Sequence, residues 1–192
     1  MKNSNKGSLK KKLLLLILPL IVIIVSLVMV INFTSTKSII TKSTYQELEK
    51  ESNYNTNIIE AWKERILSSL DSVKNTLETI EFRSEKEELD YLTSVTNQLI
   101  DSIPNGIYEG ASDGTYLDGS GWQPDDDYII SERDWYKEGL HNESFEFGAP
   151  YLDANTGSFI VSASTHIKRN NIKDLVAAVD IPLDDITQMV AK

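Results

Sequence analysis

The sequence contains no cysteine among its 192 residues. Without cysteine there is no disulfide, no thiol nucleophile and no cysteine ligand for a zinc ion. Histidine is also scarce: His141 and His166 are the only two, and neither has a metal-binding spacing or an evident nucleophile beside it. The acidic run Asp125–Asp127 lacks the glycine and downstream glutamate of a calcium loop. We therefore expect a protein that is not an enzyme and needs no metal or cofactor.

Basic residues are outnumbered, with 19 lysines and arginines against 29 acidic residues and a net charge of −10. Five of the lysines precede residue 13 without any acidic residue among them, so the rest of the chain is more acidic still. Because contacts to phosphates need a basic face, we expect no nucleic-acid partner.

Charge is absent from residues 13–31, which read LLLLILPLIVIIVSLVMVI. As a helix this run spans about 28 Å, close to the hydrocarbon core of a bilayer. It is longer than the apolar part of a typical signal peptide, and no A-x-A cleavage site follows it. Lysines before the run and glutamates beyond it predict a cytoplasmic N-terminus by the positive-inside rule. We expect a cytoplasmic segment over 1–12, a transmembrane helix over 13–33 in the cell membrane, and an extracellular remainder.

Glycine and proline are both missing from residues 35–82, which predicts a long helix. Its apolar residues recur at steps of three and four, the spacing of one helical face. Such a stripe indicates a core or a dimer seam, and we expect a homodimer through this helix. Ser84–Glu87 fits a capping box for a second helix that ends near Pro104, so residues 34–104 form a helical region. The stripe consists of Ile59, Trp62, Ile66, Leu70, Val73, Leu77 and Ile80.

Residues 105–192 favour short strands, so the predicted fold class is α+β with an antiparallel sheet. We expect a loop and hairpin over Ala111–Asp127, and a helix over Glu132–Leu140 capped by Ser131. Turns are predicted at Asp153–Gly157 and Asn170–Asn171, and a last helix over Leu183–Val190. The predicted strands are Gly106–Gly110, Phe145–Leu152, Phe159–Lys168 and Leu175–Ile181.

The stretch YIISERDWY, residues 128–136, combines one arginine with large aromatic residues. A guanidinium matches a carboxylate, and aromatic walls exclude water around it. Two acids at strand edges, Asp153 and Asp180, could hold a cation opposite Arg133, which together would suit an α-amino acid. Structural roles stay open at this point. Arg133 could form a surface salt bridge, Trp135 and Tyr136 could be core residues, and the two acids could belong to turns or strand ends.

These residues carry a resemblance to the double Cache (dCache) extracellular sensor domains of bacterial methyl-accepting chemotaxis proteins. The likeness runs from Asp113-Gly114 through Arg133–Tyr136, Pro150–Asp153 and Thr156-Gly157 to Val179–Pro182. Within that family, the chain resembles the amino-acid-binding subset. The resemblance implies that Tyr128, Arg133 and Trp135 hold a ligand carboxylate, that Tyr151, Asp153 and Asp180 hold its ammonium group, and that Tyr136 lines the pocket.

The resemblance implies a long membrane-to-tip helix followed by a PAS-like, membrane-distal ligand-binding module over 105–192. The family continues with a second module, a second membrane helix and a signalling region, so we expect this chain to be the N-terminal part. The implied function is an extracellular sensor for an amino acid or related amine in chemotaxis. Alternatives are the sensor of a histidine kinase or cyclic-dinucleotide enzyme, or a ligand-free scaffold. We expect the ligand's side chain to meet the loop Tyr116–Asp127 and the strand Glu143–Phe147, with Trp122 either as a lid or packed on the surface.

Overall fold

The computed structural model describes residues 5–169 and 174–190, with side-chain burial from residue 10 onward. The chain divides into two compact units, residues 1–54 and residues 55–192, and each is described by itself. Helix α1 (Asn5–Thr79) begins in the first unit and ends in the second. The predicted turn at Asn170–Asn171 lies outside the described residues.

The first unit is helical through its apolar run. The side chains of residues 13–31 are exposed, and Pro19 lies within the helix. The stretch is long and apolar enough to cross a membrane, with a mean hydropathy of 3.4. Residues 13–33 are helical, as expected, whereas the membrane crossing and its orientation stay predictions.

The second unit is built on an antiparallel sheet in the order β2-β1-β6-β5-β3, with β4 also paired to β5. The two longest strands pair along most of their length, from Ile160 opposite Pro182 to Ile167 opposite Leu175. Between them they form the centre of the sheet. The strands are β1 (Ile107–Gly110), β2 (Tyr116–Asp118), β3 (Glu146–Phe147), β4 (Tyr151–Leu152), β5 (Phe159–Ile167) and β6 (Leu175–Pro182).

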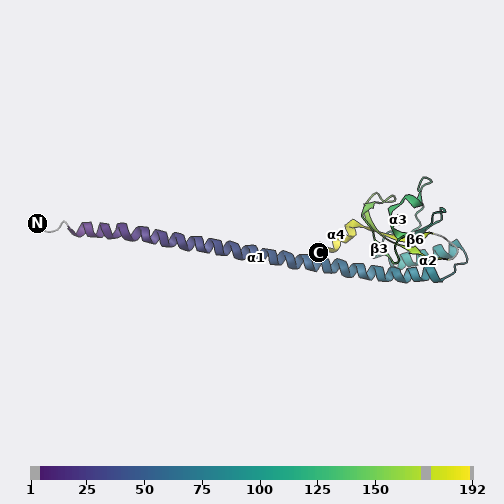
Figure 1. Ribbon diagram of the computed structural model, residues 1–192, viewed down its shortest axis with the longest axis horizontal. Coiled ribbons are helices and arrows are strands. Elements are labelled where there is room, and N and C mark those ends of the chain that lie inside the picture. The colour runs from purple at the N-terminus through teal and green to yellow at the C-terminus, as the bar shows by residue number, and fades with distance from the viewer. Residues whose placement is uncertain (1–4, 170–173, 191–192) are drawn as a thin grey trace. The chain divides into compact units, whose positions relative to one another are not determined.

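The two faces of the sheet carry separate buried clusters, because successive side chains of a strand point to opposite faces. On β6, Leu175, Ala177, Val179 and Ile181 join a large core with α1 and α2, whereas Val176 and Ala178 join a smaller aromatic cluster with α3. Figure 1 shows α3 across the sheet from the last turns of α1. The helices after α1 are α2 (Glu85–Gln98), the 3₁₀ helix η1 (Ile130–Glu132), α3 (Asp134–Gly139) and α4 (Leu183–Val190).

The apolar stripe of α1 belongs to this chain's own core. Trp62, Ile66, Leu70, Val73 and Leu77 are buried against the sheet and α2. The core interpretation of the stripe is therefore confirmed. These side chains are covered within one chain, so they do not provide the dimer seam that we expected from them.

The signal for the second helix is confirmed at its start. Ser84 accepts a hydrogen bond from the Glu87 backbone N–H, and the Glu87 carboxylate accepts one from the Arg83 N–H at 2.7 Å. The helix ends at Gln98, earlier than predicted, because the Leu99 carbonyl accepts from both Ser102 and Ile103 in a tighter turn.

Two other predicted elements differ in detail. Ser131 does not cap a helix: it lies within η1, and α3 starts only at Asp134, with Arg133 as its N-cap residue. The strand predicted over Phe145–Leu152 is split into β3 and β4. Between them lies Pro150, which has no N–H to donate to a ladder. The hairpin β1–β2, the strands β5 and β6 and the helix α4 are confirmed.

Candidate functional site

Asp180 lies on the face of β6 that carries the aromatic cluster, two residues beyond Ala178. Its carboxylate accepts hydrogen bonds from the hydroxyls of Tyr108 at 2.8 Å, Tyr151 at 3.4 Å and Ser162. The hydroxyl oxygens of Tyr151 and Ser162 lie 2.7 Å apart, so the single Tyr151 proton is shared between Ser162 and the more distant Asp180. The acid is 9% exposed. Three neutral hydroxyls therefore surround a buried carboxylate that has no cationic partner in these contacts.

Burial sets the protonation of this group. It raises the pKa of Asp180 to about 6, with the charge of Asp153 adding to the rise and the three hydroxyl donors opposing it. Burial and the nearby Asp180 charge raise the pKa of Tyr108 and of Tyr151, so both phenols remain donors. Near neutral pH, burying the ionised Asp180 carboxylate costs free energy, and a bound cation would offset that cost.

Arg133 approaches from the other side, out of the turn between η1 and α3. Its backbone is extended, with φ −76° and ψ 142°, because it is the last residue before the helix. Its guanidinium carbon lies 4.5 Å from the centre of the Tyr128 ring, a cation–π contact. The Tyr128 hydroxyl in turn accepts the indole N–H of Trp135 at 3.1 Å. Arg133 therefore contacts Tyr128, and Trp135 in turn holds the Tyr128 hydroxyl.

Asp153 stands at the start of the turn after β4. Its carboxylate accepts from the backbone N–H groups of Asn155 and Thr156 and from the Thr156 hydroxyl at 2.6 Å. Gly157 closes the turn with φ +69°, a conformation that favours glycine. The predicted turn role of Asp153 is therefore confirmed, and the same residue also faces the cavity described next.

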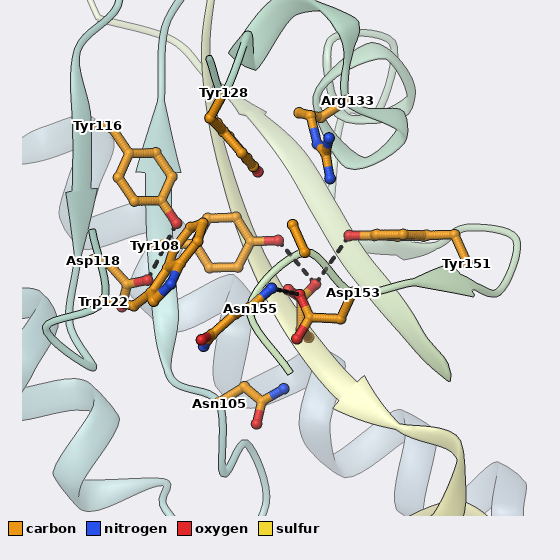
Figure 2. Close-up of a pocket in the computed structure, with 12 residues that line it drawn as sticks. Asn105, Tyr108, Tyr116, Asp118, Trp122, Tyr128, Arg133, Tyr151, Asp153 and Asn155 are labelled. Carbon is orange, nitrogen blue, oxygen red and sulfur yellow. Dashed lines mark hydrogen bonds between the residues drawn. The ribbon is translucent and has the colours of Figure 1, made fainter. Parts of the chain in front are cut away.

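One cavity of about 20 Å³ brings most of the predicted site residues together (Figure 2). Five of the seven line it: Tyr128, Arg133, Tyr151, Asp153 and Asp180. They come from the loop before α3, the β4 turn and β6, which are far apart in the sequence. The remaining lining residues are Asn105, Tyr108, Tyr116, Asp118, Trp122, Ala154 and Asn155.

Trp135 and Tyr136 are not among the residues that line the cavity. They are 1% and 2% exposed in the aromatic cluster beneath it, and the Tyr136 hydroxyl donates to the Asp174 carbonyl at 2.7 Å. The prediction that Tyr136 lines the pocket is wrong for this structure. Because α3 begins at Asp134, both side chains point at the sheet. The helix also packs so closely that a Cβ on Gly139 would lie 2.4 Å from Val176.

Sequence reasoning missed several lining residues. Tyr108 and Asp118 occupy cross-strand positions that only the sheet register reveals. Trp122 lies in the loop from which we expected the lid, and it does line the cavity. The strand that we expected to contribute, Glu143–Phe147, has no residue on the cavity wall. Its Phe147 instead stacks on Trp62 of α1 at 5.8 Å.

Comparison with known proteins places this chain in a family. Residues 83–188 match the methyl-accepting chemotaxis protein-like family, first PDC sensor domain. This match covers more than half of the sequence. The chain belongs to this chemoreceptor sensor family. It is also 26% identical, over 94% of its length, to a probable methyl-accepting chemotaxis protein of Bacillus thuringiensis subsp. konkukian, of which it spans 27%.

Solved structures of chemoreceptor sensory domains share the fold. The Campylobacter jejuni Tlp3 sensory domain with isoleucine bound aligns with a TM-score of 0.64 and 21% identity, covering 79% of this chain and 64% of that one. The Pseudomonas aeruginosa PctC ligand-binding domain in complex with GABA gives 0.68 and 21%, covering 77% and 68%. The sensor therefore has the α+β architecture of chemoreceptor ligand-binding domains.

Proposed function

We propose that this sensor binds an amino acid or a related amine outside the cell and thereby drives transmembrane signalling in chemotaxis. The observation that carries the proposal is that Arg133 and Asp180 line one cavity from different elements. A guanidinium pairs with a carboxylate through parallel hydrogen bonds, and a buried carboxylate is best matched by a cation. An α-amino acid carries both complementary groups.

The contacts assign roles within this proposal. Arg133 and the Tyr128 hydroxyl bind the ligand carboxylate, and Trp135 positions Tyr128 by its 3.1 Å hydrogen bond. Asp180 accepts from the ligand ammonium together with the hydroxyl of Tyr151. Asp153 contributes mainly negative charge, because three donors of its own turn already occupy its oxygens.

The ligands of similar sensors support this class. Tlp3 was crystallised with isoleucine, PctC with GABA, and CtaA of Pseudomonas fluorescens with L-alanine. All three molecules carry an ammonium group and a carboxylate. The CtaA domain aligns with a TM-score of 0.61 at 19% identity over 75% of this chain and 62% of that one.

Ligand entry requires the site to open. A cavity of about 20 Å³ has room for roughly one water molecule, far less than an amino acid needs. Trp122 and Asn155 lie on loops at the cavity wall, where a change in loop conformation would widen the cavity. A ligand that binds only the open form would shift the population towards that form.

Strand β1 links the cavity to the core on the helix side of the sheet. Tyr108 donates to Asp180 on the cavity side, whereas its neighbour Ile107 lies in the core that contains α1 and α2. A change in the Tyr108–Asp180 contact on ligand binding would therefore reach the packing against α1 through a single strand. Residues 1–12 would lie in the cytoplasm, 13–33 in the membrane, and a homodimer would form through side chains of α1 that the core leaves exposed, such as Tyr45 and Leu48.

Thermal unfolding of the full chain in lipid nanodiscs tests the binding proposal. The probes are each common amino acid and GABA. A ligand at 100 times its Kd stabilises the fold by about 2.7 kcal/mol, which gives a measurable rise in Tm. We expect at least one probe to stabilise the wild type, and Arg133→Ala and Asp180→Asn to abolish that rise. Controls are Arg83→Ala and Asp126→Asn, both exposed and outside the cavity wall.

The outcomes separate the parts of the proposal. If no probe stabilises the wild type, the assignment of an amino-acid ligand fails. If a probe stabilises wild type and both cavity variants equally, the ligand binds elsewhere and the cavity is not the site.

A further inference from the structure

The cavity carries more negative charge than a zwitterionic ligand can balance. One cationic side chain, Arg133, lines it together with three carboxylates, those of Asp118, Asp153 and Asp180. A neutral amino acid brings one carboxylate for Arg133 and one ammonium group for Asp180 or Asp153. Asp118 would then stay without a cation although it is only 3% exposed. Buried carboxylates are normally paired, so this residue calls for a partner.

The sheet register places Asp118 and Asp180 on the same face. Asp118 on β2 lies opposite Tyr108 on β1, and Tyr108 lies opposite Ala178 on β6, two residues before Asp180. With strands about 4.8 Å apart and about 3.4 Å per residue, the two aspartates are separated by about 12 Å between Cα atoms. The two carboxylates therefore suit cationic groups at opposite ends of one ligand.

Aromatic rings surround the cavity next to Asp118. Tyr116, Trp122 and Tyr128 contact one another edge to face, with ring centres 5.6 to 6.1 Å apart, and all three line the cavity. Figure 2 shows Asp118, Tyr116 and Trp122 on one side of Tyr108, with Arg133 and Tyr151 on the other. Aromatic faces attract cations, as the position of Arg133 over Tyr128 already shows.

Asp118 retains capacity to bind a ligand. Its carboxylate accepts from the Ser120 backbone N–H at 2.7 Å and from the Tyr116 hydroxyl at 3.2 Å. An ionised carboxylate has about four acceptor positions, so two remain. Burial raises the pKa of Asp118, which indicates that its charge is incompletely compensated in the absence of a ligand.

We propose that the ligand is an α-amino acid whose side chain ends in a cation, and that Asp118 selects it together with Tyr116 and Trp122. This inference rests on the proposed function, in which Arg133 and Asp180 hold the α-carboxylate and the α-ammonium. Asp118 then binds the distal ammonium or guanidinium group of the same ligand. Neutral and acidic amino acids would leave its charge unpaired.

Two matched comparisons test the inference. L-lysine and L-norleucine share a four-carbon side chain and differ only in the terminal ammonium group. Asp118→Asn removes the charge but keeps an oxygen for the Ser120 N–H. We expect isothermal titration of the full chain in nanodiscs to give at least tenfold tighter binding of lysine than of norleucine, and Asp118→Asn to remove that difference.

Each result has one meaning. Equal or tighter binding of norleucine by the wild type overturns the selection by Asp118 while the proposed function stands. Unchanged preference in a folded Asp118→Asn protein also overturns it. If that variant does not fold, the wild-type preference for lysine over norleucine and over L-glutamate decides alone. If none of the common amino acids binds the wild type, the proposed function fails, and this inference fails with it.

Discussion

Replacing Asp180 with asparagine should stabilise the unliganded sensor near neutral pH. Burial gives the carboxylate a pKa of about 6 in the folded protein against an ordinary value of 3.8. Each unit of this difference corresponds to about 1.4 kcal/mol, so ionised Asp180 destabilises the fold by about 3 kcal/mol at pH 7. Asparagine has no charge to desolvate, and the hydroxyls of Tyr108, Tyr151 and Ser162 can each rotate to donate or accept.

The pH dependence follows from the sign of the pKa change. Because the folded pKa is raised, the stability associated with protonated Asp180 is fully present below pH 3.8 and is lost as pH rises through about 6. The gain from Asp180→Asn should therefore be about 0.5 kcal/mol at pH 4 and reach about 3 kcal/mol at pH 7. A site kept at such a cost is consistent with selection for binding.

Urea unfolding followed by tryptophan fluorescence measures this gain, with the full chain in nanodiscs and without ligand. Trp62 and Trp135 lie in the two clusters on opposite faces of the sheet and report on both. The exposed Asp126→Asn change serves as the control and should stay within about 0.5 kcal/mol of wild type. An Asp180→Asn protein that is less stable than wild type at pH 7, or equally shifted at pH 4 and 7, would refute the reasoning.

Two more predictions concern charge. Ligand affinity should fall as pH drops through 6, by about tenfold per pH unit below it, because only ionised Asp180 pairs with the ammonium group. Titration calorimetry between pH 5 and 8 measures this affinity. A flat profile would exclude Asp180 as the acceptor. On the helix side of the sheet, Arg169 forms a buried ion pair with Glu88 and donates to the Leu77 carbonyl at 2.6 Å. Arg169→Ala should therefore cost about 3–5 kcal/mol in urea unfolding, whereas exposed Arg83→Ala should cost under about 0.5 kcal/mol; equal effects would contradict this packing.

Local signals in the sequence predicted much of the fold. The 3.6-residue period from Trp62 to Leu77 identified a buried helical face, and Ser84 marked the start of α2. The strand pattern before Pro182 placed Asp180 at the end of β6. Each of these depends on residues close together in the chain, where spacing alone carries the information.

The site was less predictable because it depends on register and on where one short helix begins. Tyr108 and Asp118 reach the cavity only through the pairing of β2 with β1 and of β1 with β6. Trp135 and Tyr136, which we expected at the cavity, do not line it, because α3 starts at Asp134. A difference of two residues at a helix start turns its side chains towards another surface, and sequence patterns rarely fix such a boundary.

The most direct test of the account is a set of titrations that removes one ligand group and one side chain together. The ligands are the tightest-binding amino acid, its α-amide and its N-acetyl derivative, and the proteins are wild type, Arg133→Ala and Asp180→Asn. We predict that loss of the ligand carboxylate weakens binding to wild type but not further to Arg133→Ala, and that loss of the ammonium weakens binding to wild type but not further to Asp180→Asn. Fully additive losses in both pairs would contradict the claim that this cavity binds the two ends of an amino acid.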